Sequence, residues 1–411
     1  MFQQLSAQVP AAGGQLQVLL KNVNALMDKY LLDPAELFQV KFLTSQFRLL
    51  CAHVAALQSE LLWVKQGRVF SNAGFPPFLG SVFIRDQPAF SVALKGKPFE
   101  DPYVVEVVSG VLVDVKAAGS ATATLLCKEI EFDGQTLDHA TIEMDAARRV
   151  GVFSQLRPLM SARMNATYVQ FFVELSIGGG PVARFKSDFS EPSLIITHDS
   201  QWLEAESKML KLEVFRDAKV APWQRIANAL HLRYMRMTKQ ELKDPARKLT
   251  LSDLHYFYHR FFMATTVNVS KFDKFLQWFM PVLQQLRFKR HIKPMWLQGL
   301  IFGFIDKEKC NRTLAAFEEG TFLLRFSESS PGLFAVAYVS DDKHEPVKHY
   351  LVKPEDISSL SLADFIRAKP QWVQLLQLDP NTSALTKQHK NKALHPYLTP
   401  DQKQTGGYVL L

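Results

Sequence analysis

An arginine stands inside a strongly apolar run in the last third of the chain. The run is Thr321–Phe326, with the sequence TFLLRF, and the arginine is Arg325. Such a run is typical of a central strand that is buried on both faces. A guanidinium in that position needs an anionic partner or a polar pocket, because burying an unpaired charge is costly. Its planar fork suits two-point contact with a phosphate, so the run predicts an anion site.

Two serines and a glutamate come directly after this run. Ser327 and Ser329, together with the amides of the following loop, can donate further hydrogen bonds to a phosphate. Glu328 offers a different interpretation, in which its carboxylate pairs with Arg325 inside the protein and no ligand is bound. The residues alone leave both interpretations open.

The segment 320–330, GTFLLRFSESS, closely resembles the phosphotyrosine-binding strand of the SH2 domains of the signal transducers and activators of transcription, the STAT family. Upstream, residues 296–308 are similar to the sequence that leads into the first SH2 helix of that family. Downstream, residues 349–352 and 362–367 look like the next strand and the second helix, and His395–Leu398 resembles the segment that closes the domain.

This resemblance implies a role for each residue of the predicted pocket. Arg325 would be the main phosphate ligand, and Lys307, Ser327, Glu328 and Ser329 would line the pocket around it. Taken alone, Lys307 is an ordinary solvated lysine at the start of a helix, which Asp306 can cap.

Tyr408 lies in a polar, glycine-containing segment, where a kinase can reach it. Its Gly-Tyr-Val context resembles the STAT phosphorylation site. Tyr397 is the rival acceptor, but it lies in the segment that closes the SH2 domain. We therefore expect an upstream tyrosine kinase to phosphorylate Tyr408. Reciprocal binding of two phosphorylated tails then gives a closed homodimer.

The first part of the chain, far before this site in the sequence, is predicted to be helical. Asp33 and Pro34 predict a helix start, because they combine a capping side chain with proline at the first helical position. An apolar seam with heptad spacing follows, and residues 14–31 supply an antiparallel partner helix. The seam consists of Val40, Leu43, Phe47, Leu50, Val54, Leu57 and Leu61.

Further elements complete a multidomain α+β fold in the order that STAT proteins show. Short β-branched runs predict an immunoglobulin-like β-sandwich, and helical periodicity then returns with an aromatic core face at Phe272, Phe275 and Phe279. The expected domains are a truncated helical coiled-coil bundle (1–66), an immunoglobulin-like DNA-binding β-domain (67–201), a helical linker domain (202–295), an SH2 domain (296–400) and a phosphotyrosine tail (401–411).

The same resemblance implies that the β-domain binds double-stranded DNA. Residues 90–97 look like a strand and loop that bring lysine to the duplex, and residues 192–202 look like the last strand and its exit. The candidate residues are Lys95, Lys97, Arg148, Arg149, Arg184, Lys186 and His198. Residues 69–200 hold 11 Lys and Arg against 15 Asp and Glu. These cations must therefore gather at one edge to bind phosphates, and otherwise each is an ordinary surface charge.

Several classes of protein are disfavoured by what the sequence lacks. It has no phosphate-binding GxxxxGK[ST] loop, HExxH, GxSxG or kinase HRD and DFG motif, so we expect neither an enzyme nor a cofactor. Cys51, Cys127 and Cys310 suggest neither disulfides nor a metal site. We expect no membrane insertion or secretory signal, and a cytoplasmic protein that moves to the nucleus on activation.

Two alternatives remain. An SH2 adaptor that never binds DNA fits the negative charge of residues 69–200, whereas the order of the domains argues against it. A regulatory fragment of a tyrosine kinase or phosphatase is disfavoured by the missing catalytic motifs.

Overall fold

The computed structural model of the chain describes residues 2–65, 80–88, 91–109, 120–127, 130–131, 137–138, 141–143, 150–176, 182–289, 291–380 and 382–399. They fall into two compact units, Met1–Glu213 and Val214–Leu411. The division lies inside helix α3 (Trp202–Phe215), so the predicted domain boundaries stay predictions.

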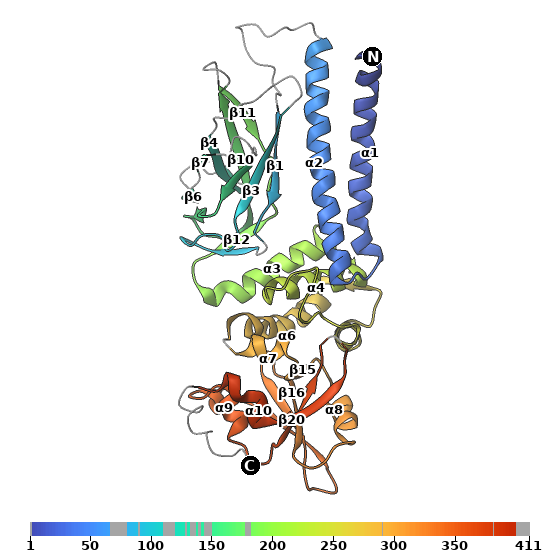
Figure 1. Ribbon diagram of the computed structural model, residues 1–411, viewed down its shortest axis with the longest axis vertical. Helices are drawn as coiled ribbons and strands as arrows, with labels where there is room; N and C mark the ends of the chain where they lie inside the picture. Colours follow the sequence, from blue (N-terminus) through green and yellow to red (C-terminus); the bar gives the residue numbers. More distant parts are fainter. Residues whose placement is uncertain are drawn as a thin grey trace. The chain divides into compact units, whose positions relative to one another are not determined.

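The first unit begins with two long helices, α1 (Phe2–Lys29) and α2 (Pro34–Lys65), which lie side by side in Figure 1. The predicted helix start is confirmed: the amide of Glu36 donates to Asp33 Oδ1 at 3.0 Å, and the amide of Asp33 donates to Glu36 Oε2 at 2.8 Å. The helices approach closely at Gly13, where an added Cβ would lie 3.1 Å from Cγ1 of Val54.

The predicted seam is wrong at two of its positions. Leu43 and Leu50 are 42% and 46% exposed, whereas Thr44 and Cys51, one residue further along, are half-buried. The reason is that α2 lies against strands β1 and β3 as well as against α1. Its buried face is therefore rotated relative to the one that a simple pair of helices would share.

A β-sandwich makes up most of the rest of this unit. One sheet has the order β1 (Gly80–Asp86), β3 (Tyr103–Ser109), β8 (Val150–Phe153). The other has the order β2 (Val92–Leu94), β12 (Ser193–Ile196), β10 (Ala162–Ser176), β4 (Ser120–Cys127), β5 (Ile130–Glu131), with β11 (Val182–Lys186) beside β10 and β7 (Thr141–Glu143) beside β4. A short pair, β6 (Leu137–Asp138) and β9 (Arg157–Pro158), completes it.

The sandwich core combines residues from both sheets. Val105 and Phe153 come from the first sheet, and Val169, Phe171 and Ile195 from the second, and all are at most 1% exposed. The rings of Phe153 and Phe171 lie 4.8 Å apart between centroids. The predicted β-sandwich is therefore present in the described part of this region.

The second unit opens with paired helix–loop–helix segments. Its elements are β13 (Val220–Pro222), α4 (Trp223–Met237), α5 (Leu251–Phe257), a π-helical turn η2 (Tyr258–Phe262), β14 (Thr266–Asn268), α6 (Val269–Phe288) and α7 (Ile292–Leu297). Strands β13 and β14 pair in antiparallel fashion and join the two loops. Phe272, Phe275 and Phe279 are fully buried and contact Phe257 and Phe262, which confirms the predicted aromatic core.

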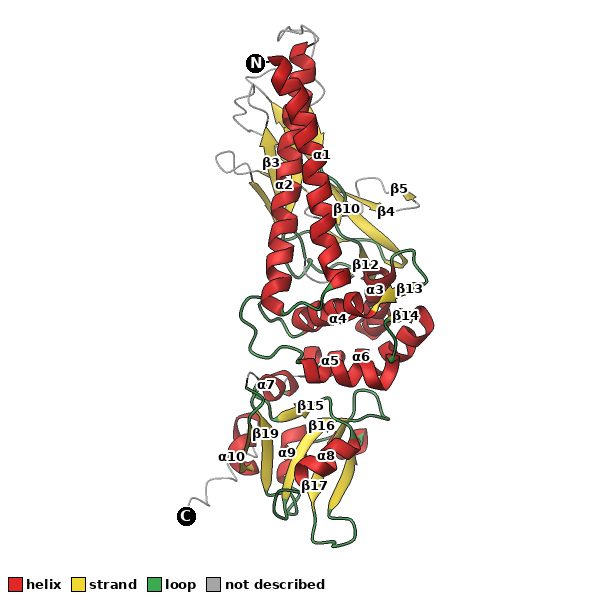
Figure 2. Ribbon diagram, turned by 90° about the vertical axis from the view of Figure 1, so that its right-hand side faces the viewer, coloured by secondary structure: helices red, strands yellow, loops and turns green. Residues whose placement is uncertain are grey.

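A sheet with helices on its two faces follows, as Figure 2 shows. The strand order is β18 (Val347–Val352), β17 (Phe334–Val339), β16 (Thr321–Phe326), β19 (Gln374–Leu378), β20 (Leu385–His389), and β15 (Ile301–Gly303) also pairs with β16. The helical elements are α8 (Lys307–Leu314), η3 (Pro354–Ile357), α9 (Leu362–Arg367), α10 (Lys390–Leu394) and η4 (His395–Tyr397).

Strand β16 divides its side chains between the two faces of this sheet. Leu323 packs with Cys310 and Leu314 of α8. Phe322 packs on Trp372, which in turn contacts Phe365 of α9. Because side chains alternate along a strand, Arg325 lies on the same face as Leu323, on the side of α8.

Candidate functional site

Arg325 lies in the middle of a fully buried central strand, as its apolar run predicts. All six residues of β16 are buried, and Arg325 is 5% exposed. It pairs with Ala335 of β17 on one side and with Gly303 of β15 on the other. The strand therefore fixes the backbone on both sides of the guanidinium.

The contacts of Arg325 leave part of its hydrogen-bonding capacity unused. Nη1 lies 3.2 Å from the carbonyl oxygen of Phe326, 3.5 Å from that of Ile305 and 3.7 Å from Oε2 of Glu328. Nε is buried and has no hydrogen-bond partner among the described residues. A separation of 3.7 Å exceeds the range of a hydrogen bond. Glu328 therefore compensates the charge only partly and does not saturate the fork.

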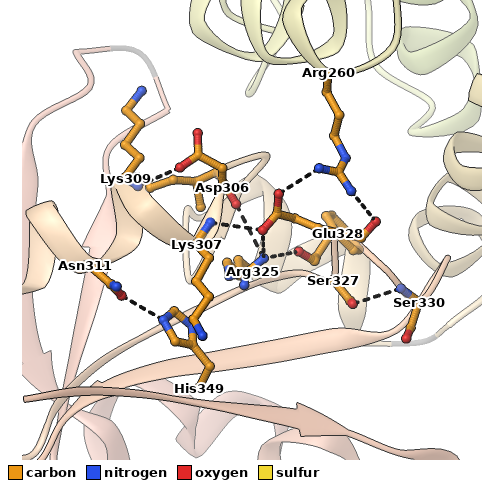
Figure 3. Close-up of polar contacts among 12 residues, drawn as sticks. Arg260, Asp306, Lys307, Lys309, Asn311, Arg325, Ser327, Glu328, Ser330 and His349 are labelled. Carbon is orange, nitrogen blue, oxygen red and sulfur yellow. Dashed lines mark hydrogen bonds and ion pairs between the residues drawn. The ribbon is translucent and has the colours of Figure 1, made fainter. Parts of the chain in front are cut away.

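Glu328 is held instead by other groups, as Figure 3 shows. The amide of Lys307 donates to its Oε2 at 3.0 Å, and Nη1 of Arg260 donates to its Oε1 at 3.0 Å. Nη2 of Arg260 also donates to the carbonyl oxygen of Glu328 at 3.0 Å. These bonds fix the carboxylate at the edge of the site.

The other predicted pocket residues lie at the start of α8 and in the loop after β16. Asp306 caps α8, since its Oδ1 accepts from the amide of Lys309 at 2.6 Å, and the side chain of Lys307 is exposed. Ser327 is buried, and its Oγ accepts from the amide of Ser330 at 3.1 Å. Ser329 is exposed. The structure thus brings Arg325, Ser327, Glu328 and the start of α8 together around one guanidinium.

His349 also belongs to this cluster, although the sequence indicated it only as part of a strand. Its Nε2 lies 2.8 Å from Oδ1 of Asn311 in α8. Burial, together with the nearby charges of Arg325 and Lys307, lowers the pKa of the imidazole from 6.5 to about 4. His349 is therefore neutral at physiological pH and adds no charge to the site.

The sequence alone does not point to Arg260 either, because this residue lies far from Arg325 and Glu328 along the chain. Its contact with Glu328 spans 68 residues, and it comes from η2 in the preceding helical segment. Nothing in the local sequence around Arg260 indicates that contact.

Three of the candidate DNA-binding residues gather at one edge of the β-sandwich. Strands β2 and β12 are parallel, so their C-terminal ends meet, and the amide of Lys95 donates to the carbonyl oxygen of Ile196 at 2.8 Å. Lys95, Lys97 and His198 are all exposed there. Arg163 is a further exposed cation at this edge, since its neighbour Ala162 pairs with Ile195.

Among the remaining candidates, only Lys186 has a described side chain, and it lies away from that cluster. Lys186 is exposed but pairs with Phe172 of β10, whereas Ala162 of the same strand pairs with Ile195. This separation of roughly ten residues corresponds to about 30 Å along the strand. Lys186 therefore does not lie at the edge that carries Lys95, Lys97 and His198. Arg148, Arg149 and the side chain of Arg184 lie outside the described residues.

The described residues contain no group of three or more His, Cys, Asp or Glu side chains placed to hold a metal ion. None of the described helices combines the length and apolarity that crossing a bilayer requires.

Comparison with known proteins identifies three segments. Residues 81–196 match the family model of the STATa immunoglobulin-like domain, residues 198–289 that of an EF-hand fold domain, and residues 300–378 that of the SH2 domain. The EF-hand match agrees with the paired helix–loop–helix segments joined by β13 and β14. Loop 216–222 has one carboxylate, Asp217, and loop 263–268 has none, so neither loop has the set of carboxylates that is typical of an EF-hand calcium site.

Two similar proteins come from Dictyostelium discoideum. Signal transducer and activator of transcription A is 28% identical over 408 residues, which are 95% of this chain and 56% of that protein. Signal transducer and activator of transcription B is 27% identical over 457 residues, which are 98% of this chain and 38% of that protein. The chain thus spans about half, or less, of the length of these relatives. The match to the STATa immunoglobulin-like domain, the SH2 match after it, and the similarity to both proteins over nearly all of its residues support a place for this chain in the STAT family.

Proposed function

We propose that this chain is a non-enzymatic, signal-dependent transcription factor that an SH2–phosphotyrosine contact activates. The observation that carries the proposal is Arg325, a buried guanidinium whose Nε has no hydrogen-bond partner in the part of the chain that the structure describes. Its one described carboxylate neighbour, Glu328, lies at 3.7 Å and is hydrogen-bonded to other groups. A phosphate that enters the site gains charge-assisted hydrogen bonds that the protein itself does not supply.

The chemistry of the surrounding groups favours a phosphate on tyrosine. Arg325 and Lys307 supply two positive charges for a group that carries nearly two negative charges at neutral pH. The neutral ring of His349 lies close to both, since their charges lower its pKa. Phosphotyrosine carries its phosphate further from the peptide backbone than phosphoserine does, which suits an arginine that is only 5% exposed.

An upstream tyrosine kinase would phosphorylate Tyr408, which lies outside the described residues. Tyr397 is 4% exposed, and its hydroxyl donates to Oε1 of Gln298 at 2.7 Å, so its role is structural. Two phosphorylated chains would bind each other's SH2 domain and form a homodimer that moves from the cytoplasm to the nucleus. There the edge with Lys95, Lys97 and His198 would contact double-stranded DNA.

An SH2 adaptor without DNA binding is the second candidate, and the 11 basic and 15 acidic residues in 69–200 favour it. A gel-shift titration of the phosphorylated protein with pools of palindromic duplexes separates the two candidates. A transcription factor gives a shift that weakens as salt rises, and an adaptor gives none.

The test of the pocket is calorimetric titration of the whole chain with a phosphotyrosine peptide that spans Tyr408. The unphosphorylated peptide serves as the control. We expect Arg325→Ala to lose about 100-fold or more in affinity, because each charge-assisted hydrogen bond contributes about 1.5–3 kcal/mol. Arg325→Lys should recover little of it, since a point charge lacks the fork. Unchanged affinity in Arg325→Ala would show that the phosphate binds elsewhere.

A further inference from the structure

Two side chains of the helical segment 214–289 hold the loop that follows Arg325. Nε1 of Trp278, in α6, donates to the carbonyl oxygen of Ser327 at 2.9 Å, and this contact is buried. Nη2 of Arg260, in η2, donates to the next carbonyl oxygen, that of Glu328, at 3.0 Å. Two successive peptide groups of the proposed phosphate loop are thus fixed from outside the sheet that carries Arg325.

This anchoring sets the direction of the loop amides. No cis peptide bond occurs among the described residues, and in a planar trans peptide the N–H points away from the C=O. Since the carbonyl oxygens of Ser327 and Glu328 face the helical segment, the amides of Glu328 and Ser329 point the opposite way. Within the described residues, neither amide donates to a protein acceptor. Both remain available to an anion.

The carboxylate of Glu328 lies between two arginines at unequal distances. Nη1 of Arg260 is 3.0 Å from Oε1, whereas Nη1 of Arg325 is 3.7 Å from Oε2. The Arg260 contact is a hydrogen bond and the Arg325 contact is not. Arg260 therefore neutralises the carboxylate and holds it back from Arg325. If Arg260 were removed, the closest cation to the Glu328 carboxylate would be the guanidinium of Arg325. Glu328 would then compete with a phosphate for that guanidinium.

The local backbone around Arg260 is unusual. It lies in the π-helical turn Tyr258–Phe262, which ends at Met263 with φ 46°. π-Helical turns are rare and are frequent at functional sites, because the extra residue re-aims the side chains of the turn. Here the turn places Arg260 against Glu328.

We propose that Arg260 is a positioning residue of the phosphotyrosine site: its fork takes both the carboxylate and the carbonyl oxygen of Glu328, and so keeps Arg325 open for phosphate. Trp278 supports the same loop through Ser327. The inference rests on the proposed function, because it assumes that Arg325 binds phosphotyrosine. It makes the helical segment part of the phosphate site rather than a spacer before the SH2 domain.

The test is titration of the full chain and its variants with one phosphotyrosine peptide that spans Tyr408. Arg260→Gln should bind about tenfold more weakly, which corresponds to about 1.4 kcal/mol. Arg260→Lys keeps the charge but loses the fork, so its affinity should fall between those of the unaltered chain and Arg260→Gln. Thermal melting of each variant serves to check that the fold is retained.

The decisive variant combines Arg260→Gln with Glu328→Gln. If Glu328 competes with phosphate once Arg260 is gone, removing its charge restores most of the lost affinity. A merely structural role of Arg260 predicts no such recovery.

Arg312→Gln is the matched control. It removes the same charge from an exposed pair with Glu308 in α8, whose atoms lie 3.5 Å apart, and should change the affinity less than about twofold.

The outcomes are distinct. If the unaltered chain binds no phosphopeptide, the proposed function is wrong. If it binds and Arg260→Gln binds equally well, only the positioning role is wrong. If the double variant is as weak as Arg260→Gln, or if Arg312→Gln weakens binding as much, Arg260 does not act by restraining Glu328.

Discussion

His349 is a neutral imidazole beside two cations, and its titration can be followed directly. Its pKa lies at about 4 instead of 6.5, because of burial and the charges of Arg325 and Lys307. The unfolded state therefore binds more protons between these two values. The stability from the neutral ring is complete above pH 6.5 and is lost as the pH falls toward 4.

The titration can be measured by NMR of the histidine rings, with the His349 resonance assigned by its loss in His349→Gln. We expect the midpoint of its pH titration to lie well below that of an exposed histidine. A bound phosphopeptide should raise this midpoint, because the phosphate offsets both cations. A midpoint near 6.5 in the free protein would mean that the ring does not lie next to Arg325 and Lys307.

Single residues show what the sequence can and cannot predict about the site. Arg325 was predictable because its apolar neighbours in 321–326 indicate a buried strand, and burial makes an arginine conspicuous. Arg260 was not, because its importance comes from a contact 68 residues away. Local patterns contain no information about such a partner.

Strands β2 and β12 end side by side, and this parallel pairing gathers Lys95, Lys97 and His198. Charge reversal of Lys95 and Lys97 together should weaken DNA binding by the phosphorylated protein and flatten its salt dependence, because both lysines would no longer displace counterions.

Lys186→Glu is the control, and it is compared with Lys95→Glu and with Lys97→Glu alone, because each of these changes alters the net charge by two units. Lys186 pairs with β10 at a point about 30 Å along the strand from Ala162, which pairs with Ile195 at the edge of Lys95 and Lys97. Lys186→Glu should leave the salt dependence nearly unchanged. An equal effect of all three single changes would show that the field of the whole domain matters rather than this edge.

The elements were predictable where their signal is local, and less so where it depends on packing. The start of α2 follows from Asp33, Pro34 and Glu36, which lie within one turn. The buried face of α2 does not, because it also depends on β1 and β3, and this is why Leu43 and Leu50 are exposed. The continuous apolar run 321–326 predicted a buried strand, but not its pairing with β15 or β17.

For the whole molecule, the proposal requires a twofold dimer in which each chain supplies one tail and one pocket. From Leu398 to Tyr408 an extended chain reaches at most about 35 Å, so the tail can leave its own domain. Both contacts form in the same dimer, and the second gains from high effective concentration. The dimer should therefore be tighter than one phosphopeptide bound to one chain.

The most direct test of tail exchange is the mass in solution of the phosphorylated chain, measured by light scattering beside Tyr408→Phe and Arg325→Ala. The phosphorylated chain should have twice the monomer mass of 46.7 kDa. Both variants should stay monomeric, Tyr408→Phe because it offers no phosphate and Arg325→Ala because it cannot bind one. A dimer that persists in either variant, or a phosphorylated chain that stays monomeric, would contradict the proposal.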